Sequence, residues 1–371
     1  MERYINKKGK KLRYGYTTGT CAVAAATAAT KILFDQQKLE TINVSTPKGW
    51  TLQLKVEDIE IKVDEVICSV TKDSGDDPDI THGIKIYAKV RKKDQQNGIT
   101  VKGGKGIGTV TRPGLYVPVG EKAINPVPMR CIKEEVKKVL PENCAVEIEI
   151  FAPEGEKIAF KTFNGKLGIK GGISILGSTG IVEPMSDDAL KDALALELRV
   201  VSKEKHNKIV LCPGNYGKDF AQRLGITDKP ILKTSNFIGF LLDKAVEEEI
   251  KEILFIGHIG KMIKVAGGIF NTHSNIADGR LEILAAHCAL LKEDRKLIKM
   301  IMDSTTTEEA IDYVYNANLQ CVFPQLADAV SERCKERTNH KINIGTILFS
   351  QKYGKLGACN EAKNILGVKN E

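Results

Sequence analysis

The densest group of chemically reactive side chains in the sequence lies between residues 73 and 82. It holds four carboxylates and a histidine: Asp73, Asp76, Asp77, Asp79 and His82. Carboxylates packed this closely can bind a cation, or their pKa values can rise into the range that suits proton transfer. An EF-hand is excluded, because Pro78 occupies the glycine position and Ile84 replaces the bidentate glutamate. A functional carboxylate site and a solvated acidic turn both fit this composition.

A second group consists of glycine-rich loops that follow short apolar strands in the second half of the chain. The loops are Gly177–Gly180, Gly214–Gly217 and Gly257–Lys261, and Ser235–Phe237 follows a strand in the same way. In open α/β sheets, ligands bind beyond the carboxyl ends of the strands, because glycine admits the ligand close to the backbone and the next helix offers free N–H groups. One such loop is most often only a tight turn, but four together favour a nucleotide-like ligand.

These loops match no common phosphate-binding motif. A G-x-G-x-x-G sequence that opens a helix is absent, and the Walker pattern fails because Gly106 follows Lys105. An ATP-driven enzyme is therefore disfavoured. Among the histidines, His82, His258 and His273 share a loop with other ligand-type residues. Lone histidines are more often structural than catalytic. These three are candidate functional residues only because of the residues beside them in the sequence.

The elements that position these residues come from a chain of 371 residues, a length that predicts two domains of ordinary size. Hydrophobic residues make up 42% and charged residues 27%, which excludes a disordered, collagenous or membrane-embedded protein. The net charge of +8 is concentrated in residues 1–13, which hold six basic side chains and one acidic. Nucleic acid is therefore not an expected partner, whereas an anionic small molecule is compatible.

Cysteine usage and the amino-terminal pattern predict a cytoplasmic protein. Nine cysteines occur without a C-x-x-C pair, which argues against a zinc site or a disulfide scaffold and favours reduced thiols. Residues 21–34 superficially resemble a secretory signal, but Thr27, Thr30 and Lys31 interrupt the apolar run, and Thr17–Thr20 reads as a helix N-cap. No segment approaches the roughly 20 apolar residues of a membrane span, so no membrane partner is expected.

The hydrophobic pattern predicts an α+β domain at residues 1–167 and an α/β domain at residues 168–371. In the first domain we expect a helix after residue 20, a hairpin of strands 42–45 and 51–56, further strands at 66–70, 83–90 and 146–151, and a helix at 131–140. In the second, short apolar strands alternate with amphipathic helices, which is typical of a mainly parallel sheet. Its strands are expected near 173–176, 209–212, 230–234, 253–256 and 343–349.

Several strings of the sequence resemble the cobalt-precorrin-5B C-1 methyltransferase family of anaerobic cobalamin (vitamin B12) biosynthesis. They begin with Tyr16–Cys21, Lys72–Gly83 and Thr111–Leu115. The likeness continues in the same order to Ala277–Arg280 and spans roughly residues 14–290, while the last 80 residues match less distinctly. Lys105 and Phe240 depart from the family pattern, which expects an acidic and a polar residue there.

The resemblance implies S-adenosylmethionine as methyl donor and a cobalt-containing, partly built corrin macrocycle as acceptor, methylated at C-1 to give cobalt-precorrin-6A. Cobalt arrives within this substrate, so no metal site of the protein is required. Together with the loops, the resemblance predicts a donor site at Gly214, Asn215, Tyr216, Gly217, Ser235, Asn236, Gly257, His258 and Gly260. Substrate-binding residues are expected at Thr18, Asp73, Arg112, Ser178, Thr179, Asn271 and His273. The candidate catalytic residues are Asp76, Asp77 and His82, with His82 orienting a carboxylate.

Two other hypotheses come from different classes of protein. A non-catalytic carrier of a corrinoid or nucleotide would use the same loops to bind and hand over an intermediate. An RNA-binding protein would use the basic amino terminus, and its affinity would fall steeply with salt.

Overall fold

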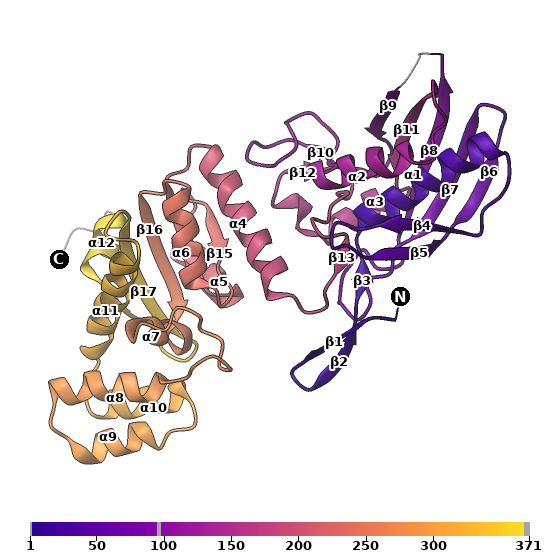
Figure 1. The fold of residues 1–371 in the computed structure, drawn as a ribbon. Helices are drawn as coiled ribbons and strands as arrows, with labels where there is room; N and C mark the ends of the chain where they lie inside the picture. The colour runs from indigo at the N-terminus through magenta and orange to yellow at the C-terminus, as the bar shows by residue number, and fades with distance from the viewer. Residues whose placement is uncertain (1, 95–97, 367–371) are drawn as a thin grey trace. The chain divides into compact units, whose positions relative to one another are not determined.

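The computed structural model describes residues 2–94 and 98–366, and it contains two compact units, Met1–Ala189 and Leu190–Glu371 (Figure 1). The predicted combination of a strand-rich α+β part and a mainly parallel α/β part is confirmed. The first unit extends further than the predicted boundary at residue 167, because strands β12 (Ile169–Lys170) and β13 (Ile181–Val182) pair with β10 (Thr109–Val110) and β3 (Gly15–Tyr16).

Unit 1 is built around a buried helix, α1 (Thr18–Asp35), that packs on a five-stranded sheet (Figure 1). Alanine fills much of α1, so the helix approaches the strands closely, and Thr17 caps it by accepting the Thr20 N–H. The stretch that resembles a secretory signal is therefore part of the core. The sheet has the order β6 (Glu57–Ile61), β7 (Glu65–Thr71), β8 (Lys85–Lys93), β11 (Ala145–Phe151) and β9 (Gly98–Gly103), and only the β11/β9 pair is parallel.

The other elements of unit 1 surround this core. The predicted hairpin is confirmed as β4 (Thr41–Ser45) and β5 (Thr51–Lys55), with every second side chain buried. Helix α2 (Pro126–Lys137) begins before the predicted residue 131, because a proline is accommodated in the first turn of a helix. The remaining elements are the hairpin β1 (Tyr4–Lys7) and β2 (Lys10–Arg13), helix α3 (Gly155–Ala159) and the 3-10 helix Phe163–Gly165.

Unit 2 contains a sheet with the order β15 (Ile231–Lys233), β14 (Lys208–Cys212), β16 (Glu252–His258), β17 (Asn343–Ser350) and β18 (Gly354–Ala358). Neighbouring strands of this sheet run parallel, except that β18 is antiparallel to β17. The predicted strand at 173–176 is wrong: Ile173 and Ile175 lie in unit 1 and form isolated bridges to Ile107 and Ile124. A short apolar run looks alike in both settings, so the sequence pattern could not separate them.

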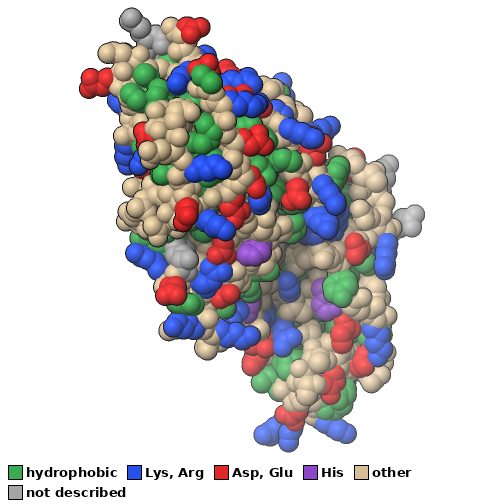
Figure 2. Space-filling model, turned by 90° about the vertical axis from the view of Figure 1, so that its right-hand side faces the viewer, with side chains coloured by type: hydrophobic (Ala, Val, Ile, Leu, Met, Phe, Trp, Pro, Cys, Tyr) green, Lys and Arg blue, Asp and Glu red, His purple; other side chains and the backbone are tan. Residues whose placement is uncertain are grey.

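The helices of unit 2 connect and cover these strands. They are α4 (Asp187–Lys203), α5 (Asn215–Arg223), α6 (Ile238–Glu247), α7 (Ile259–Ala266), α8 (Arg280–Leu291), α9 (Arg295–Met302), α10 (Thr307–Asn316), α11 (Val322–Arg337) and α12 (Asn360–Leu366). No helix in the described part of the chain is long and apolar enough to cross a membrane. On the face drawn in Figure 2, basic and acidic side chains are interspersed.

Candidate functional site

The acidic loop, defined here as residues 73–83, connects β7 to β8 and lies against the start of the chain. The Tyr16 N–H donates to the Asp73 carbonyl at 2.8 Å, and the Asp76 N–H donates to the Arg13 carbonyl at 3.0 Å. A Cβ at Gly15 would lie 2.2 Å from the Ser74 carbonyl carbon, and Gly75 has a φ of +64°. These two glycines allow the loop and the β2–β3 segment to approach this closely.

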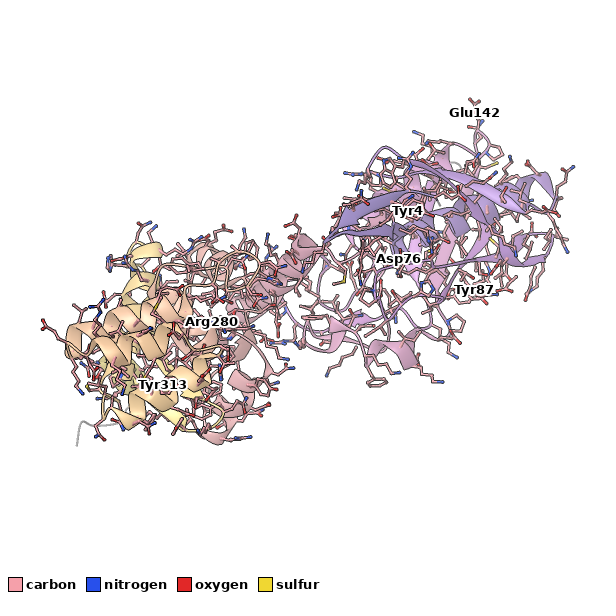
Figure 3. All side chains as sticks on the ribbon, turned by 90° about the horizontal axis from the view of Figure 1, so that it is seen from below. Tyr4, Asp76, Tyr87, Glu142, Arg280 and Tyr313 are labelled. Carbon is pink, nitrogen blue, oxygen red and sulfur yellow. The ribbon has the colours of Figure 1, made fainter. Side chains whose placement is uncertain are left out.

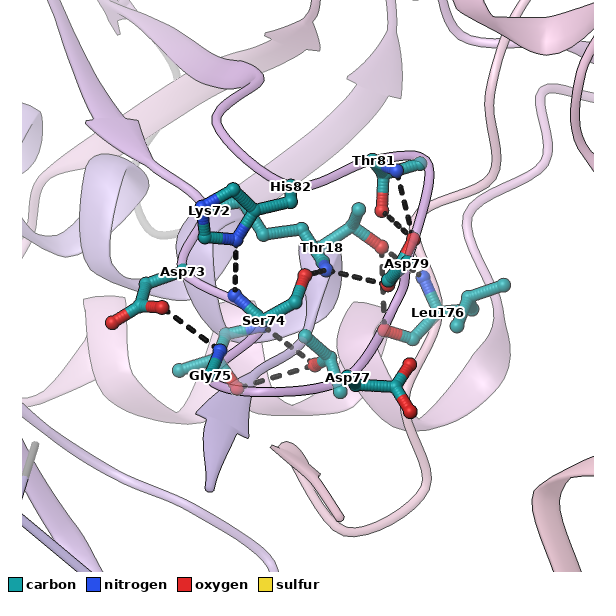
Figure 4. A network of polar contacts seen from close by, with 12 residues as sticks. Thr18, Lys72, Asp73, Ser74, Gly75, Asp77, Asp79, Thr81, His82 and Leu176 are labelled. Carbon is teal, nitrogen blue, oxygen red and sulfur yellow. Dashed lines mark hydrogen bonds and ion pairs between the residues drawn. The ribbon is translucent and has the colours of Figure 1, made fainter. Parts of the chain in front are cut away.

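Two of the four aspartates in the acidic loop are fully engaged in holding it. Both oxygens of Asp73 accept from the Arg13 guanidinium, and one also accepts the Gly75 N–H. Asp79 accepts from the buried ammonium of Lys72 at 2.7 Å and, through its other oxygen, from Thr81 (Figure 4). Hydrogen bonding to Arg13 lowers the pKa of Asp73, while for Asp79 the Lys72 charge and the Thr81 bonds outweigh burial and lower its pKa.

Asp76 and Asp77 each keep one carboxylate oxygen without a protein partner among the described residues. One oxygen of Asp76 accepts the Arg13 N–H at 2.6 Å, and one oxygen of Asp77 accepts the Met185 N–H at 2.9 Å. Asp76 is exposed and marked in Figure 3, and Asp77 is half-buried. Of the acidic loop's carboxylates, these two can meet a ligand or exchange a proton, whereas Asp73 offers no unengaged oxygen to a substrate.

His82 does not orient a carboxylate in this structure. Its Nδ1 accepts the Ser74 N–H at 3.1 Å, so the neutral ring carries its proton on Nε2. No hydrogen bond joins His82 to Asp76 or Asp77 within the described residues, and the side chain is exposed. The expected orienting role is thus not supported by the geometry.

Thr18 and the loop Gly177–Gly180 lie together in unit 1. The buried Thr18 hydroxyl accepts the Leu176 N–H and donates to the Ser174 carbonyl, each at 3.0 Å. Ser178 and Thr179 are exposed, and the Thr17 N–H donates to the Gly180 carbonyl. The Gly177–Gly180 loop therefore does not follow a strand of the parallel sheet, and three predicted glycine or serine loops, not four, meet in unit 2.

We expect the change Thr18→Val to lower the free energy of unfolding by about 1–3 kcal/mol, because it removes the partner of a backbone N–H and a buried hydroxyl bond. Urea denaturation measures this loss. Thr51→Val, at an exposed position of β5, is the matched control and should change stability little. A fully stable Thr18→Val protein that binds the expected corrinoid substrate poorly would instead support the predicted substrate-binding role.

Arg112 lies elsewhere in unit 1, where one guanidinium nitrogen donates to the Lys166 carbonyl at 2.8 Å. Its stem packs on Gly168, where a Cβ would lie 2.3 Å from the Arg112 Cγ and Cδ, and the φ of +73° there also favours glycine. Its substrate-binding role stays a prediction.

In unit 2 the predicted donor loops gather at the carboxyl ends of three parallel strands. The connection from β14 leads to β15 on one side, and the connection from β16 leads to β17 on the other. A crevice forms outside the sheet where neighbouring connections diverge, and this switch point is where open α/β sheets bind ligands. Residues 213–217 run from the end of β14 into the first turn of α5, and residues 257–261 run from the end of β16 into the first turn of α7, so both segments flank the switch point.

Different structural features explain why glycine occupies each of four positions at the switch point. Gly214 has a φ of +145° and open space where a Cβ would stand, so the backbone there is free to face a ligand. Gly217 packs α5 on β16, since a Cβ would lie 2.6 Å from the Ile256 carbonyl oxygen. Gly257 is confined by Met262 and Pro213. Gly260 is the residue whose N–H the His258 ring caps. Of the four, Gly214 is the one that packing does not explain.

Some polar side chains of these loops form hydrogen bonds within the protein. His258 caps α7 through Nδ1, and its Nε2 donates to Glu308 at 2.9 Å. Asn215 accepts from Lys233. Tyr216 is 66% exposed on the first turn of α5, which suits a ring that stacks on a ligand.

The segment Asn271–Asn275 lies beside the Ser235–Asn236 turn. The Thr272 N–H donates to the Asn236 carbonyl at 3.0 Å, and Asn271 bridges to Phe237. Ser235 has a φ of +52°, a strained conformation of the kind found at binding sites. His273 accepts the Asn275 N–H through Nδ1. Asn271 and His273, predicted to contact the acceptor, therefore share unit 2 with the predicted donor loops.

Several residues that organise the two sites were missed from the sequence. Arg13 and Lys72 neutralise Asp73 and Asp79, and Lys264 donates to the carbonyls of Thr272 and Ala277. Of these three basic residues, only Lys72 could have been identified from the sequence, because it directly precedes the acidic loop. Among the described residues, no group of His, Cys, Asp and Glu side chains is placed to hold a metal ion.

The structure is that of a two-unit α/β protein: one unit is an open, mainly parallel sheet with a glycine-containing connection at its switch point, and the other is a strand-rich α+β unit that carries the acidic loop. The sequence matches the family models CbiD over residues 5–184 and CbiD, C-terminal domain, over residues 271–360. The chain belongs to the CbiD family.

Relatives match over the full length. The chain is 51% identical to the cobalt-precorrin-5B C(1)-methyltransferase of Alkaliphilus metalliredigens, covering 100% of both chains, and 52% identical to that of a Thermoanaerobacter species, covering 97% of this chain and 99% of the other. A crystal structure of the cobalamin biosynthesis protein CbiD from Archaeoglobus fulgidus is 31% identical, covers 74% of this chain and 86% of its own, and has a TM-score of 0.39.

Proposed function

We propose that this chain transfers a methyl group from S-adenosylmethionine to C-1 of cobalt-precorrin-5B. Membership of the CbiD family and full-length likeness to methyltransferases of that name support the acceptor and the position methylated. The observation that carries the donor assignment is the switch point between β14 and β16, with the open Gly214 backbone and the exposed ring of Tyr216 beside it.

The residues of unit 2 have the chemistry to hold an adenosine-type donor. The first turn of α5, which has no side-chain cap, offers N–H groups, and the Tyr216 ring can stack on a base. The donor's sulfonium already activates the methyl group, so the protein has to align the reactants and exclude water. A catalytic triad is not needed for this reaction.

The acidic loop of unit 1 is proposed as the acceptor side. Asp76 and Asp77 are held by backbone N–H groups through one oxygen each and present the other, a geometry that can fix a protonation state of the macrocycle. Arg13 and Lys72 keep the flanking carboxylates charged and the loop rigid. Cobalt is part of the substrate, so the chain needs no ligands for it.

The change Tyr216→Ala tests the donor site. Loss of base stacking is expected to weaken binding of S-adenosylhomocysteine about tenfold or more, measured by calorimetry, without lowering the melting temperature, since the ring is exposed. Tyr4→Ala removes an exposed tyrosine from unit 1 and should leave this affinity unchanged. Gly214→Val is a poorer test, because a φ of +145° would strain any side chain. Equal affinity of Tyr216→Ala and the unaltered protein would contradict the assignment.

A non-catalytic carrier would bind the same ligands without chemistry. Mixing the protein with labelled S-adenosylmethionine and cobalt-precorrin-5B in a single turnover separates the two functions. We expect label in the corrinoid, and a carrier would leave all of it in the donor.

A further inference from the structure

Met185 has an unusual backbone for an apolar residue. Eleven non-glycine residues in the described part of the chain have positive φ, and Met185, at +53°, is the one with an apolar side chain. The other ten are polar or charged: nine lie in turns or at helix ends, where the left-handed conformation is common, and Asp58 lies at an irregularity of strand β6. Met185 also lies in a turn, with Pro184, but its side chain is apolar. A long apolar side chain gains nothing locally from this conformation, which is normally disfavoured by about 1–2 kcal/mol.

The surrounding structure holds Met185 in place from two distant parts of the sequence. Its N–H donates to the Asp77 carboxylate at 2.9 Å, and its carbonyl accepts from the Lys7 ammonium at 3.0 Å. Lys7 also donates to the Pro184 carbonyl and pairs with Glu183 at 2.8 Å. The acidic loop and the β1/β2 hairpin therefore clamp both polar groups of one strained residue.

This clamp presents the Met185 side chain to solvent instead of burying it. Met185 is 59% exposed, and Ile80, in the acidic loop that binds the Met185 N–H through Asp77, is also an exposed apolar side chain. Leu176, which binds Thr18 in the same unit, is a third (Figure 4). Strain that persists at an exposed position, next to a candidate site, points to a ligand contact. The β1/β2 hairpin adds exposed cationic side chains, Lys8 and Lys10.

We propose that Met185 is a substrate-contacting residue that packs on the face of the corrin macrocycle, positioned for this contact by Asp77 and Lys7. This inference rests on the proposed function. The macrocycle is flat and largely apolar with an anionic rim, so it matches an exposed apolar side chain next to a cationic hairpin. Asp77 then links the two parts of the site, since one oxygen fixes Met185 and the other faces the ligand.

The variant Met185→Gly distinguishes the effect of backbone strain on stability from the contribution of the Met185 side chain to substrate binding. Glycine adopts positive φ without cost, so the melting temperature should rise by about 1–3 °C, while KM for cobalt-precorrin-5B should rise about tenfold because an apolar contact is lost. Met185→Leu keeps the apolar contact and should keep KM within about threefold. Gln36→Gly is the matched control, because Gln36 has the same φ of 53° at the end of α1 and should gain stability without a change in KM.

An unchanged KM in Met185→Gly would overturn the proposal, and so would an equal rise in Gln36→Gly. Binding of S-adenosylhomocysteine by calorimetry accompanies each measurement and should be the same in all three variants as in the unaltered protein. Absence of methyl transfer by the unaltered protein would refute the proposed function itself, an outcome distinct from a loss of the Met185 effect.

Discussion

Replacing Asp79 by alanine should lower the free energy of unfolding by about 3–5 kcal/mol at neutral pH, because the change leaves the buried Lys72 ammonium without its charged partner. The Lys72 side chain is 2% exposed, and Asp79 is its charged partner at 2.7 Å. Among the described residues, the other hydrogen-bond partner of the ammonium is the uncharged Ser74 hydroxyl. The acidic loop is expected to loosen as well, since Asp79 also binds the backbone and side chain of Thr81. Urea denaturation followed by circular dichroism measures the loss.

The double variant Lys72→Met, Asp79→Ala is the control for this prediction. Removing both charges should recover much of the lost stability, because no unpaired charge is left buried. If the double variant is as unstable as Asp79→Ala, packing and not charge accounts for the loss. Asp76→Ala removes an exposed carboxylate from the same loop and should cost far less.

Acid should weaken the same network in the unaltered protein. The folded-state pKa values of Asp73 and Asp79 are both lowered, so the stability that they contribute is fully present above the unfolded-state pKa of about 3.9. It is lost as pH falls below that value through the folded-state pKa. The acid limb of the stability curve should therefore be shallower in Asp79→Ala than in the unaltered protein.

Local patterns in the sequence predicted most of the elements. The Thr17 cap, the β4/β5 hairpin and the parallel strands β14, β15, β16 and β17 were all expected, because caps, turns and apolar runs are set by near neighbours in the chain. The domain boundary and the strand at 173–176 were placed wrongly. Those segments are decided by pairing with β3, β10 and Ile107, which no local pattern encodes.

The candidate site was predictable as a group of residues but not as a set of roles. The sequence could not distinguish Asp73 and Asp79 from Asp76 and Asp77, because the cation that engages Asp73 is a distant residue, Arg13. It also gave no reason to expect the Asp77–Met185 contact, whose members lie 108 residues apart. The two ring nitrogens of His258 bind Gly260 and Glu308, partners that no local pattern in the sequence indicates, and its donor-binding role stays a prediction.

The largest effect on catalysis is expected for Asp77→Asn, with a fall of about 100-fold in the single-turnover rate of methyl transfer. Asparagine is close in shape and its Oδ1 can still accept the Met185 N–H, so the position of Met185 should be kept while the charge is lost. The melting temperature and the affinity for S-adenosylhomocysteine should therefore stay near those of the unaltered protein. A lower rate without these changes would mean that the acceptor side needs a carboxylate at this position.

Asp76→Asn is the matched comparison, because Asp76 accepts a backbone N–H from Arg13 in the same manner and also presents one unpartnered oxygen. If Asp76 is the carboxylate that sets the protonation state of the macrocycle, the rate should fall in this variant and not in Asp77→Asn. Asp77→Ala then tests the other proposed role of Asp77, which is to position Met185. The change removes the acceptor of the Met185 N–H, so KM for the corrinoid should rise even if the charge of Asp77 is dispensable. A variant Asp77→Asn that is destabilised but transfers methyl groups at the full rate would remove Asp77 from the catalytic residues and leave it a purely positioning role.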